Sequence, residues 1–460
     1  MKKLLFALLL ISAFALAQEP QAVAIHNAKI VTVSGPVIAK GTVVVRNGLI
    51  EAVGENVQVP ADAWVVDGEG MTVYPGLIDA LSTVGMPGAA PAAAAAAGGR
   101  GGGGRNAAAT PAAAAAPAAR SNGPEDRPQT TSWLLAADEV SPTDKRIETV
   151  RGAGITTVVA YPERGIFAGQ GAVIDLISGE KSGEMVVASP TGQYIALGGG
   201  RGGGGGGGFP ASLMGVLAYV HQIYLDAEHY KLVKAAYDKN PNGMQRPQYD
   251  RALEGVMDSP RILLPATREV EIDRLIHFAA ELKQPYILYG LHEAYRPEAV
   301  DLLKKAGVPV LLSMHWPEPG RGADVHLEDE TLRQLETYDL AATAPALLQK
   351  AGVKFALYAD GLDAPRDIQR AVKKAMDAGL SREDALRALT LTPAEIYGVA
   401  NRVGSIEKGK IGNLVVTKGD IFENNTKIEM VFVDGKKYTP AADAAGGRGA
   451  AATDNPGGNQ

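Results

Sequence analysis

Short runs of alternating apolar and polar residues dominate both ends of the chain. After Ala22 the stretch "TVVVRNGLIEAVG" holds two apolar runs joined by Asn47-Gly48, a pair typical of a tight hairpin turn. The same style returns near the other end in "GNLVVTKGD" and "IEMVFVDGKKY", where Asp434-Gly435 marks a second turn. We therefore expect residues 22–73 and 401–438 to form one small β-sandwich domain built from both chain ends.

Between these ends, over residues 74–400, apolar strands alternate with amphipathic helices. Such alternation is typical of parallel βαβ units, and eight parallel strands inside a ring of helices are the simplest closure. The fold class predicted is therefore α/β, a TIM-like (β/α)8 barrel. The run Thr392-Pro393-Ala394-Glu395 predicts a helix that starts with Thr392 as its cap. Four strands, each followed by a helix, are clear: "RILLPA" before 269–283, "PYILYG" before 296–306, "PVLLSM" before a helix ending near Gly352, and "KFALYAD" before 366–379.

Three segments interrupt this rhythm, namely 88–120, 198–208 and 441–460. Their Ala/Gly-rich composition cannot bury enough apolar surface to offset the entropy of ordering, so we expect disorder there. No glycine run contains the Lys-Ser/Thr of a phosphate-binding loop, and no aromatic residues are interleaved with the arginines. Nucleotide and RNA binding are therefore not predicted from these segments.

The composition favours an exported protein without nucleic-acid partners. The chain has 460 residues, 46% of them apolar, and a net charge of −6. "MKKLLFALLLISAFALA" has the basic start, short apolar run and small-x-small end of a signal peptide, so we expect residues 1–17 to be removed. The apolar run is shorter than the roughly 20 residues a membrane span needs. With no cysteine for disulfides or lipid attachment, the expectation is a periplasmic protein without a membrane anchor.

A β domain from both chain ends, flanking a barrel entered through "VVDGEGMTVYPGLIDA", resembles the amidohydrolase superfamily, particularly its imidazolonepropionase-like exported members. The run "GLSREDALRALTLTPAEIYGVANRVGSIEKGKIGNLVVTKGD", followed by "VFVDGKKY", is similar to that family's closing helices and its return into the sheet. The resemblance covers about residues 22 to 438. It implies a hydrolase acting on non-peptide carbon–nitrogen bonds, such as those of cyclic amides or small dipeptide-like compounds.

The resemblance also implies a zinc or other divalent metal site, which this sequence carries only in part. Active members have His-x-His after "PGLIDA", because histidines at i and i+2 of a strand point to one side and reach one metal. The aligned residues here are Leu81-Ser82-Thr83. A later histidine position falls at Pro265 or Ala266. Asp360 alone matches a family ligand, the aspartate that also shuttles a proton. Binding of metal in the family's manner is therefore not expected.

Two histidines nevertheless fall where barrel enzymes keep their chemistry. "LYGLHEAYR" and "LLSMHWPEP" place His292 and His315 just beyond the carboxyl end of a strand. With Asp360 as catalytic base and Glu293 as a substrate-binding group, they define a reduced metal site. The alternative is loop histidines satisfied by backbone or water, with Asp360 capping the following helix. The remaining histidines considered fall in the sheet domain or on outer helices: His26, His221, His229 and His277.

Two functions stay open at this stage. One is a metal-dependent amidohydrolase that acts on a small-molecule substrate with an altered site. The other is a catalytically inactive barrel that binds a small molecule, or pairs with a related active amidohydrolase or with itself.

Overall fold

The computed structural model describes residues 22–87, 127–179, 181–197, 210, 212–320, 327–362, 364–423 and 426–440. The predicted signal peptide and the segments 88–120, 198–208 and 441–460 lie outside these residues. None of the helices in the described ranges combines the length and the apolar character that crossing a bilayer requires.

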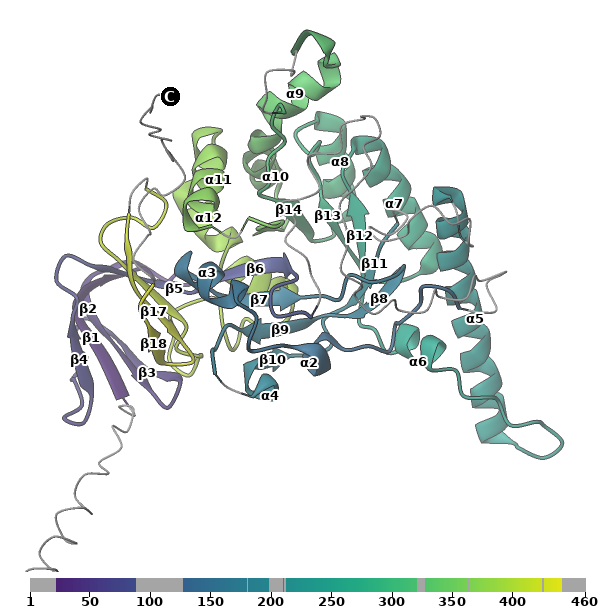
Figure 1. The fold of residues 1–460 in the computed structure, drawn as a ribbon, viewed down its shortest axis with the longest axis horizontal. Coiled ribbons are helices and arrows are strands. Elements are labelled where there is room, and N and C mark those ends of the chain that lie inside the picture. The colour runs from purple at the N-terminus through teal and green to yellow at the C-terminus, as the bar shows by residue number, and fades with distance from the viewer. Residues whose placement is uncertain are drawn as a thin grey trace, which may run out of the picture.

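Strands from both chain ends pair in one eight-stranded sheet (Figure 1). The turns at Asn47-Gly48 and Asp434-Gly435 form as predicted, with positive φ at all four residues. The two ends are joined at β5, which pairs with β1 in parallel and with β16 in antiparallel fashion. The predicted sandwich and its domain boundaries stay predictions. The strands are β1 (Ala22–Ile30), β2 (Ile38–Arg46), β3 (Leu49–Gly54), β4 (Trp64–Asp67), β5 (Thr72–Pro75), β16 (Leu414–Thr417), β17 (Ile428–Val433) and β18 (Lys436–Tyr438).

The middle of the chain forms two further sheets. A four-stranded sheet has the order β10-β9-β7-β6, and a six-stranded sheet has the order β15-β14-β13-β12-β11-β8. Strands β15 and β6 lie next to each other, so the two sheets also approach at that side. Their bounds are β6 (Leu77–Ser82), β7 (Ile155–Ala160), β8 (Phe167–Gln170), β9 (Ala172–Asp175), β10 (Val186–Ala188), β11 (Gln193–Ile195), β12 (Ile262–Ala266), β13 (Tyr286–Gly290), β14 (Val310–Ser313) and β15 (Phe355–Tyr358).

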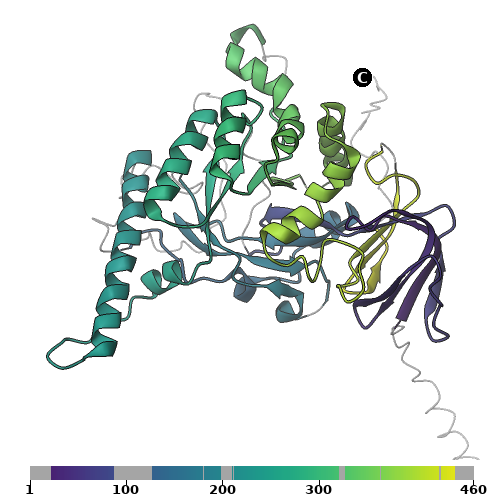
Figure 2. The same ribbon diagram turned by 180° about the vertical axis from the view of Figure 1, so that it is seen from behind.

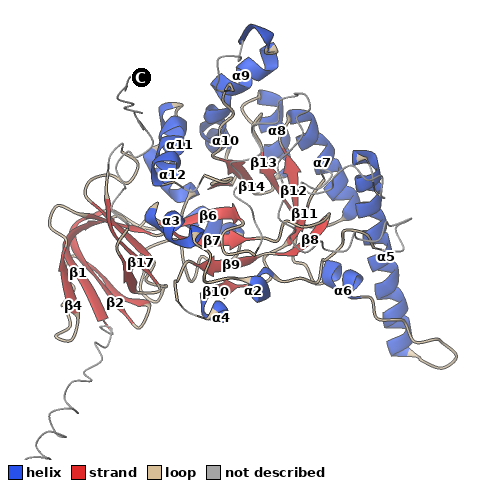
Figure 3. Ribbon diagram, viewed as in Figure 1, coloured by secondary structure: helices blue, strands red, loops and turns tan. Residues whose placement is uncertain are grey.

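Helices cover the outer side of the six-stranded sheet, as Figure 3 shows for α7, α8 and α10. The four predicted strand–helix units are present, with helix ends within a few residues of the expected ones. The helices are α2 (Ala136–Glu139), α3 (Arg146–Gly152), α4 (Ser182–Met185), α5 (Leu213–Lys239), α6 (Arg251–Met257), α7 (Glu269–Leu282), α8 (Pro297–Ala306), α9 (Leu332–Leu340), α10 (Ala344–Ala351), α11 (Pro365–Asp377), α12 (Arg382–Ala388) and α13 (Leu391–Ile396), with short 3-10 turns at Leu327–Asp329 and Ala341–Thr343.

The expectation of eight parallel strands is wrong in the first half of the barrel region. Strand β9 runs antiparallel to β7, and β8 runs antiparallel to β11. These two strands are consecutive, and the bend between them at Gly171 passes the chain from one sheet to the other. A Cβ on Gly171 would lie 2.3 Å from the ring of Tyr161, so only glycine fits this bend. The sequence pattern indicates β9, but neither its direction nor the short strands β8 and β11.

The capping prediction at Thr392 is also wrong. Helix α13 begins at Leu391, and its N-cap residue is Thr390, two residues before the predicted cap. The Thr390 hydroxyl does not cap α13 but donates a 2.6 Å hydrogen bond to the carbonyl oxygen of Leu386. Tertiary packing of this buried helix overrides the local capping signal.

Alternation along the strands divides the apolar core into an inner and an outer part. On β12 and β13, Leu263 and Ile287 contribute to an inner cluster, whereas Leu264 and Leu288 contribute to a larger cluster under the helices. Successive side chains of a strand point to opposite faces of the sheet, and here both faces carry apolar side chains. The inner cluster also contains Tyr161, Tyr289, Tyr358 and Tyr397.

Asn413 fastens the terminal sheet to the barrel region. Its side-chain amide donates hydrogen bonds to Asp175 Oδ1 at 2.8 Å and to Thr157 Oγ1 at 3.1 Å, and its Oδ1 accepts the backbone N–H of Asp434 at 2.8 Å. Asp175 is almost fully buried, and burial raises its pKa to about 7 against the hydrogen bonds from Thr157 and Asn413, which lower it. A buried acid therefore sits where the two parts of the chain meet.

Candidate functional site

The candidate residues follow neighbouring strands at their carboxyl ends. His292 comes two residues after β13, His315 two residues after β14, and Asp360 two residues after β15. Because β13, β14 and β15 are parallel, these ends lie at the same edge of the sheet. His221, His229 and His277 lie on α5 and α7, and His26 on β1, as the sequence predicts.

Asp360 is held in position by Ser313. The Ser313 hydroxyl donates a 2.7 Å hydrogen bond to Asp360 Oδ2 and accepts the backbone N–H of His315 at 3.0 Å. Asp360 has a φ of 50°, which lies in the left-handed region and re-aims the chain immediately after β15. The alternative role as a helix cap is wrong, because the N-cap of α11 is Ala364 and no side chain caps it.

His292 is a half-buried imidazole that interacts electrostatically with Asp360 and His315. Burial lowers its pKa, the charge of Asp360 opposes this effect, and a positive His315 adds to it. Its Nε2 is buried and finds no hydrogen-bond partner among the described residues. His315 is exposed by comparison. The neutral His292 ring therefore presents an unsatisfied polar atom at this edge.

Glu293 has partners within the protein. Its Oε1 accepts a 2.6 Å hydrogen bond from Arg333 Nε, and its Oε2 pairs with the other end of the same guanidinium. Oε2 also accepts the backbone N–H of Glu269 at 2.9 Å, at the start of α7. The Glu293 pKa is lowered because Arg333 and this N–H outweigh burial. The Glu293 carboxylate thus forms an ion pair with Arg333 within the protein, and its predicted contact with a substrate stays a prediction.

The residues aligned with the family's His-x-His have their own packing. Leu81, at the end of β6, lies in the inner apolar cluster with 9% of its surface exposed. The Thr83 hydroxyl accepts a 3.0 Å hydrogen bond from Arg146, and the same guanidinium donates to the Thr83 carbonyl oxygen at 2.7 Å. Arg146 is fixed in turn by Asp144. A permanent cation therefore stands at the hydroxyl that replaces the second imidazole.

Tyrosine rings fill the inner face at the strand ends. Pro265 on β12 pairs in register with Tyr289 on β13, so the position on β13 level with Pro265 carries a phenol. Tyr289 stacks on Tyr194 of β11 at 5.5 Å between ring centroids and meets Tyr358 of β15 edge-on at 6.5 Å. Burial, and then the neighbouring charges and phenols, raise the pKa of Tyr289 and Tyr358 well above the usual value. This cluster is not predicted from the sequence, although "GQYI", "ILYG" and "FALY" each place a tyrosine at the last or next-to-last residue of a strand.

Asp79, two residues before Leu81, is a second buried acid that the sequence analysis did not single out. Its Oδ1 accepts the backbone N–H of Ala359 at 2.9 Å, which ties β6 to the end of β15. Burial raises its pKa to about 7, and the nearby Asp360 charge acts in the same direction. Burial thus favours the neutral form of the Asp79 carboxyl.

These groups do not fit the metal that the family implies. A hydrolytic zinc site needs about three protein ligands at roughly 2 Å. In the described residues, no three histidine, aspartate or glutamate side chains come together as such a group. The inward positions carry leucine, proline and tyrosine, and the threonine is bound to a guanidinium.

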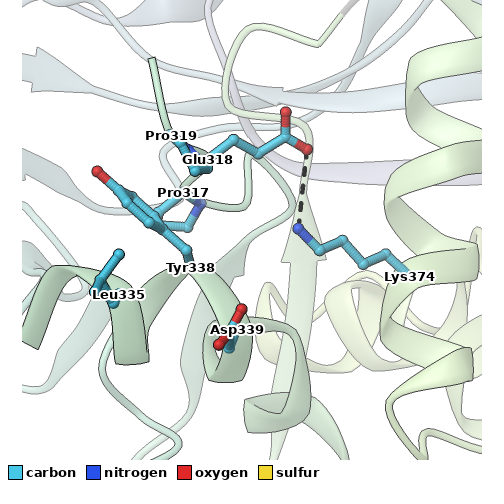
Figure 4. A pocket seen from close by; sticks show the side chains of 7 residues that line it. All are labelled: Pro317, Glu318, Pro319, Leu335, Tyr338, Asp339 and Lys374. Carbon is cyan, nitrogen blue, oxygen red and sulfur yellow. Dashed lines mark ion pairs between the residues drawn. The ribbon is translucent and has the colours of Figure 1, made fainter. Parts of the chain in front are cut away.

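A surface pocket of about 700 Å³ lies close to His315 in the chain (Figure 4). The loop after β14, helix α9 and helix α11 line it. Glu318 and Lys374 face each other across it at 3.8 Å. The remaining lining residues are Pro317, Pro319, Leu335, Tyr338 and Asp339. The pocket mixes apolar walls with both charge signs, and its lining includes no predicted site residue.

Comparisons with known proteins support the family resemblance. The family model described as "Amidohydrolase family" matches residues 277–438. The crystal structure of an amidohydrolase from Thermotoga maritima MSB8 is similar to 91% of this chain and 100% of that chain, with a TM-score of 0.70 and 26% sequence identity. The search of curated proteins found no match.

Two more distant structures share the fold. A prolidase complexed with N-methylphosphonate-L-proline is similar over 91% of this chain and 100% of its own, with a TM-score of 0.53 and 16% identity. A molinate hydrolase covers 92% of this chain and 95% of its own, with a TM-score of 0.51 and 13% identity. These matches support the resemblance to the amidohydrolase superfamily that the sequence indicates, and the structural neighbours imply a TIM-barrel-like α/β fold.

Proposed function

We propose that this chain keeps the amidohydrolase fold without the family's metal-dependent reaction, and acts as a binding module or as the partner of a related active chain. The observation that carries the proposal is the Arg146 guanidinium at the Thr83 hydroxyl, 3.0 Å away. Arg146, itself paired with Asp144, already occupies the Thr83 hydroxyl as a hydrogen-bond donor, and Leu81 offers no ligand atom to a metal. Fold alone does not decide function, so the proposal rests on these side chains.

The test is the metal content of the chain, purified without chelator, loaded with zinc and dialysed. We expect far less than one zinc per chain. Stoichiometric zinc that disappears when Asp360→Ala and His292→Ala are combined would contradict the proposal. Asp273→Ala with His277→Ala is the matched control, because this pair on α7 is exposed and lies 3.5 Å apart.

The partner role is tested separately, by co-expression with a related chain whose His-x-His motif is intact. We expect the two chains to copurify and the hydrolytic activity to belong to the partner. An active relative that shows no affinity for this chain would leave small-molecule binding as the remaining form of the proposal.

The second candidate is a hydrolase of non-peptide carbon–nitrogen bonds with an altered site. This function is favoured by two observations. Ser313 holds Asp360 through a hydrogen bond, and the charge of Asp360 acts on the neutral imidazole of His292. In that role Asp360 would take a proton from water and His292 would orient the substrate. Turnover of cyclic amides or small dipeptide-like compounds that is lost in Asp360→Asn, with the thermal stability unchanged, would support it.

We also propose that the chain is exported to the periplasm and released from its signal peptide after Ala17, on the pattern of residues 1–17. Fractionation of cells and mass determination of the mature N-terminus test this location. A full-length chain in the cytoplasmic fraction would contradict it.

A further inference from the structure

Helix α5 stands at one edge of the molecule and extends beyond it. Figures 1 and 2 show its C-terminal half projecting past the neighbouring elements. At 27 residues it is about 40 Å long. One face packs on the body through Val216, Tyr219, Val220, Ile223, Tyr224 and Ala227. This packing fixes which face points to solvent.

The solvent face carries large apolar side chains where a surface helix is normally polar. Met214, Leu225 and Leu232 are 79%, 49% and 69% exposed. Their spacings of 11 and 7 residues place them within about 20° of one another around the helix, opposite the buried face. Large apolar side chains lined up on one solvent-facing side of a helix are candidates for an interaction surface, and we call these three residues the stripe.

The charged side chains of α5 fall into two groups. Asp226 pairs with Arg127, and Lys234 pairs with Glu254 at 2.6 Å, so both are used within the chain. Glu228 and His229 lie between the two exposed leucines, and neither side chain has a hydrogen bond or ion pair with the described residues. The stripe thus leaves one acid and one imidazole available to a partner.

We propose that the stripe docks a second copy of this chain, with the two α5 helices antiparallel about a two-fold axis. In such a pair the contacts are reciprocal, so a residue at a given distance before the centre meets the residue at the same distance after it. An axis between Glu228 and His229 brings Leu225 of each copy against Leu232 of the other. The same axis sets Glu228 of each copy opposite His229 of the other. Leu225–Leu232 and Glu228–His229 match at once, whereas Met214 lies outside this contact because its opposite position falls beyond the end of α5. The self-complementarity of these two pairs selects a second copy as the occupant.

The association is tested by sedimentation velocity on the full mature chain between about 1 and 100 μM, the range in which small interfaces associate. We expect a monomer–dimer equilibrium. Leu225→Asp buries a charge at the centre of the contact and should weaken the dimer at least about tenfold. Leu332→Asp is the matched control, because Leu332 is 73% exposed on α9 and lies outside the stripe.

Charge exchange tests the antiparallel register. Glu228→Lys should set lysine against His229, and His229→Glu should set glutamate against Glu228, so each should weaken the dimer. The double variant should recover it, because the two residues face each other across the axis. Circular dichroism checks that each variant stays folded. A wild-type chain that remains monomeric throughout, or a dimer indifferent to Leu225→Asp and to both charge variants, would overturn the proposal. Copurification with a different protein on this stripe would equally overturn it.

Discussion

Replacing Asp175 by asparagine tests whether the acid between the terminal sheet and the barrel region is neutral in the folded protein. The folded-state pKa is raised from 3.8 to about 7, so folding favours the protonated form. A raised pKa contributes stability that is fully present below the unfolded value and is lost as the pH rises through the folded value. The wild-type chain should therefore lose stability between pH 4 and pH 7 on account of this group.

The size of the effect follows from the shift. Roughly three pKa units correspond to about 4 kcal/mol once both states have titrated. About 3 kcal/mol of this falls between pH 5 and pH 8, because at pH 5 the unfolded state has already lost part of its proton. Asparagine keeps an acceptor oxygen for Thr157 and Asn413, which both bond to Oδ1 of Asp175, and it does not titrate. The free energy of unfolding of the variant, relative to that of the wild type, should therefore rise by about 3 kcal/mol when the pH is raised from 5 to 8.

The assay is thermal unfolding of both chains at pH 5 and pH 8. For a chain of this size 1 kcal/mol moves the Tm by about 1 °C, so the Tm difference should change by about 3 °C in favour of Asp175→Asn. Asp238→Asn, at an exposed position on α5, is the matched control and should show no such change. If Asp175→Asn is destabilised equally at both pH values, the carboxylate is charged in the folded state and the reasoning is wrong.

Two further substitutions probe the structural contacts. Arg333→Met leaves the Glu293 carboxylate buried without its cation and should lower the free energy of unfolding by about 2 kcal/mol or more. Adding Glu293→Gln should recover much of this stability. Equal Tm values for the single variant, the double variant and the wild type would show that the ion pair does not contribute. Gly171→Ala places a Cβ 2.3 Å from the Tyr161 ring and should lower the free energy of unfolding by about 1–3 kcal/mol, measured by urea denaturation; an unchanged midpoint would show that the bend relaxes freely.

The sequence predicts the parts of the fold that local patterns encode. The hairpin turn at Asn47-Gly48 needs positive φ at both residues, which this pair supplies, and the second half repeats strand and helix regularly enough to place each element. Strand direction around Gly171 escapes such reasoning, because it depends on which distant strand β8 and β9 meet. A glycine in a strand pattern signals a bend but not its partner.

The candidate site also contains residues that the sequence could place and contacts that it could not. His292, His315 and Asp360 could be placed at strand ends from the sequence, since each follows an apolar strand directly. The partners that decide their roles come from remote parts of the chain, as Arg146 does for Thr83. The tyrosine cluster was hidden because each ring belongs to a different strand, and a tyrosine at helical or strand spacing usually indicates ordinary packing.

The order in which the terminal sheet is assembled follows from the pairing of β5 with β16. These strands are separated by more than 300 residues, so β5 has one vacant edge throughout synthesis of the barrel region. An unpaired strand edge is a template for wrong pairing, and contacts of such separation form late. Chains truncated before β16 should therefore aggregate through this edge, and a nascent chain would gain from a chaperone that covers it until the last 50 or so residues emerge.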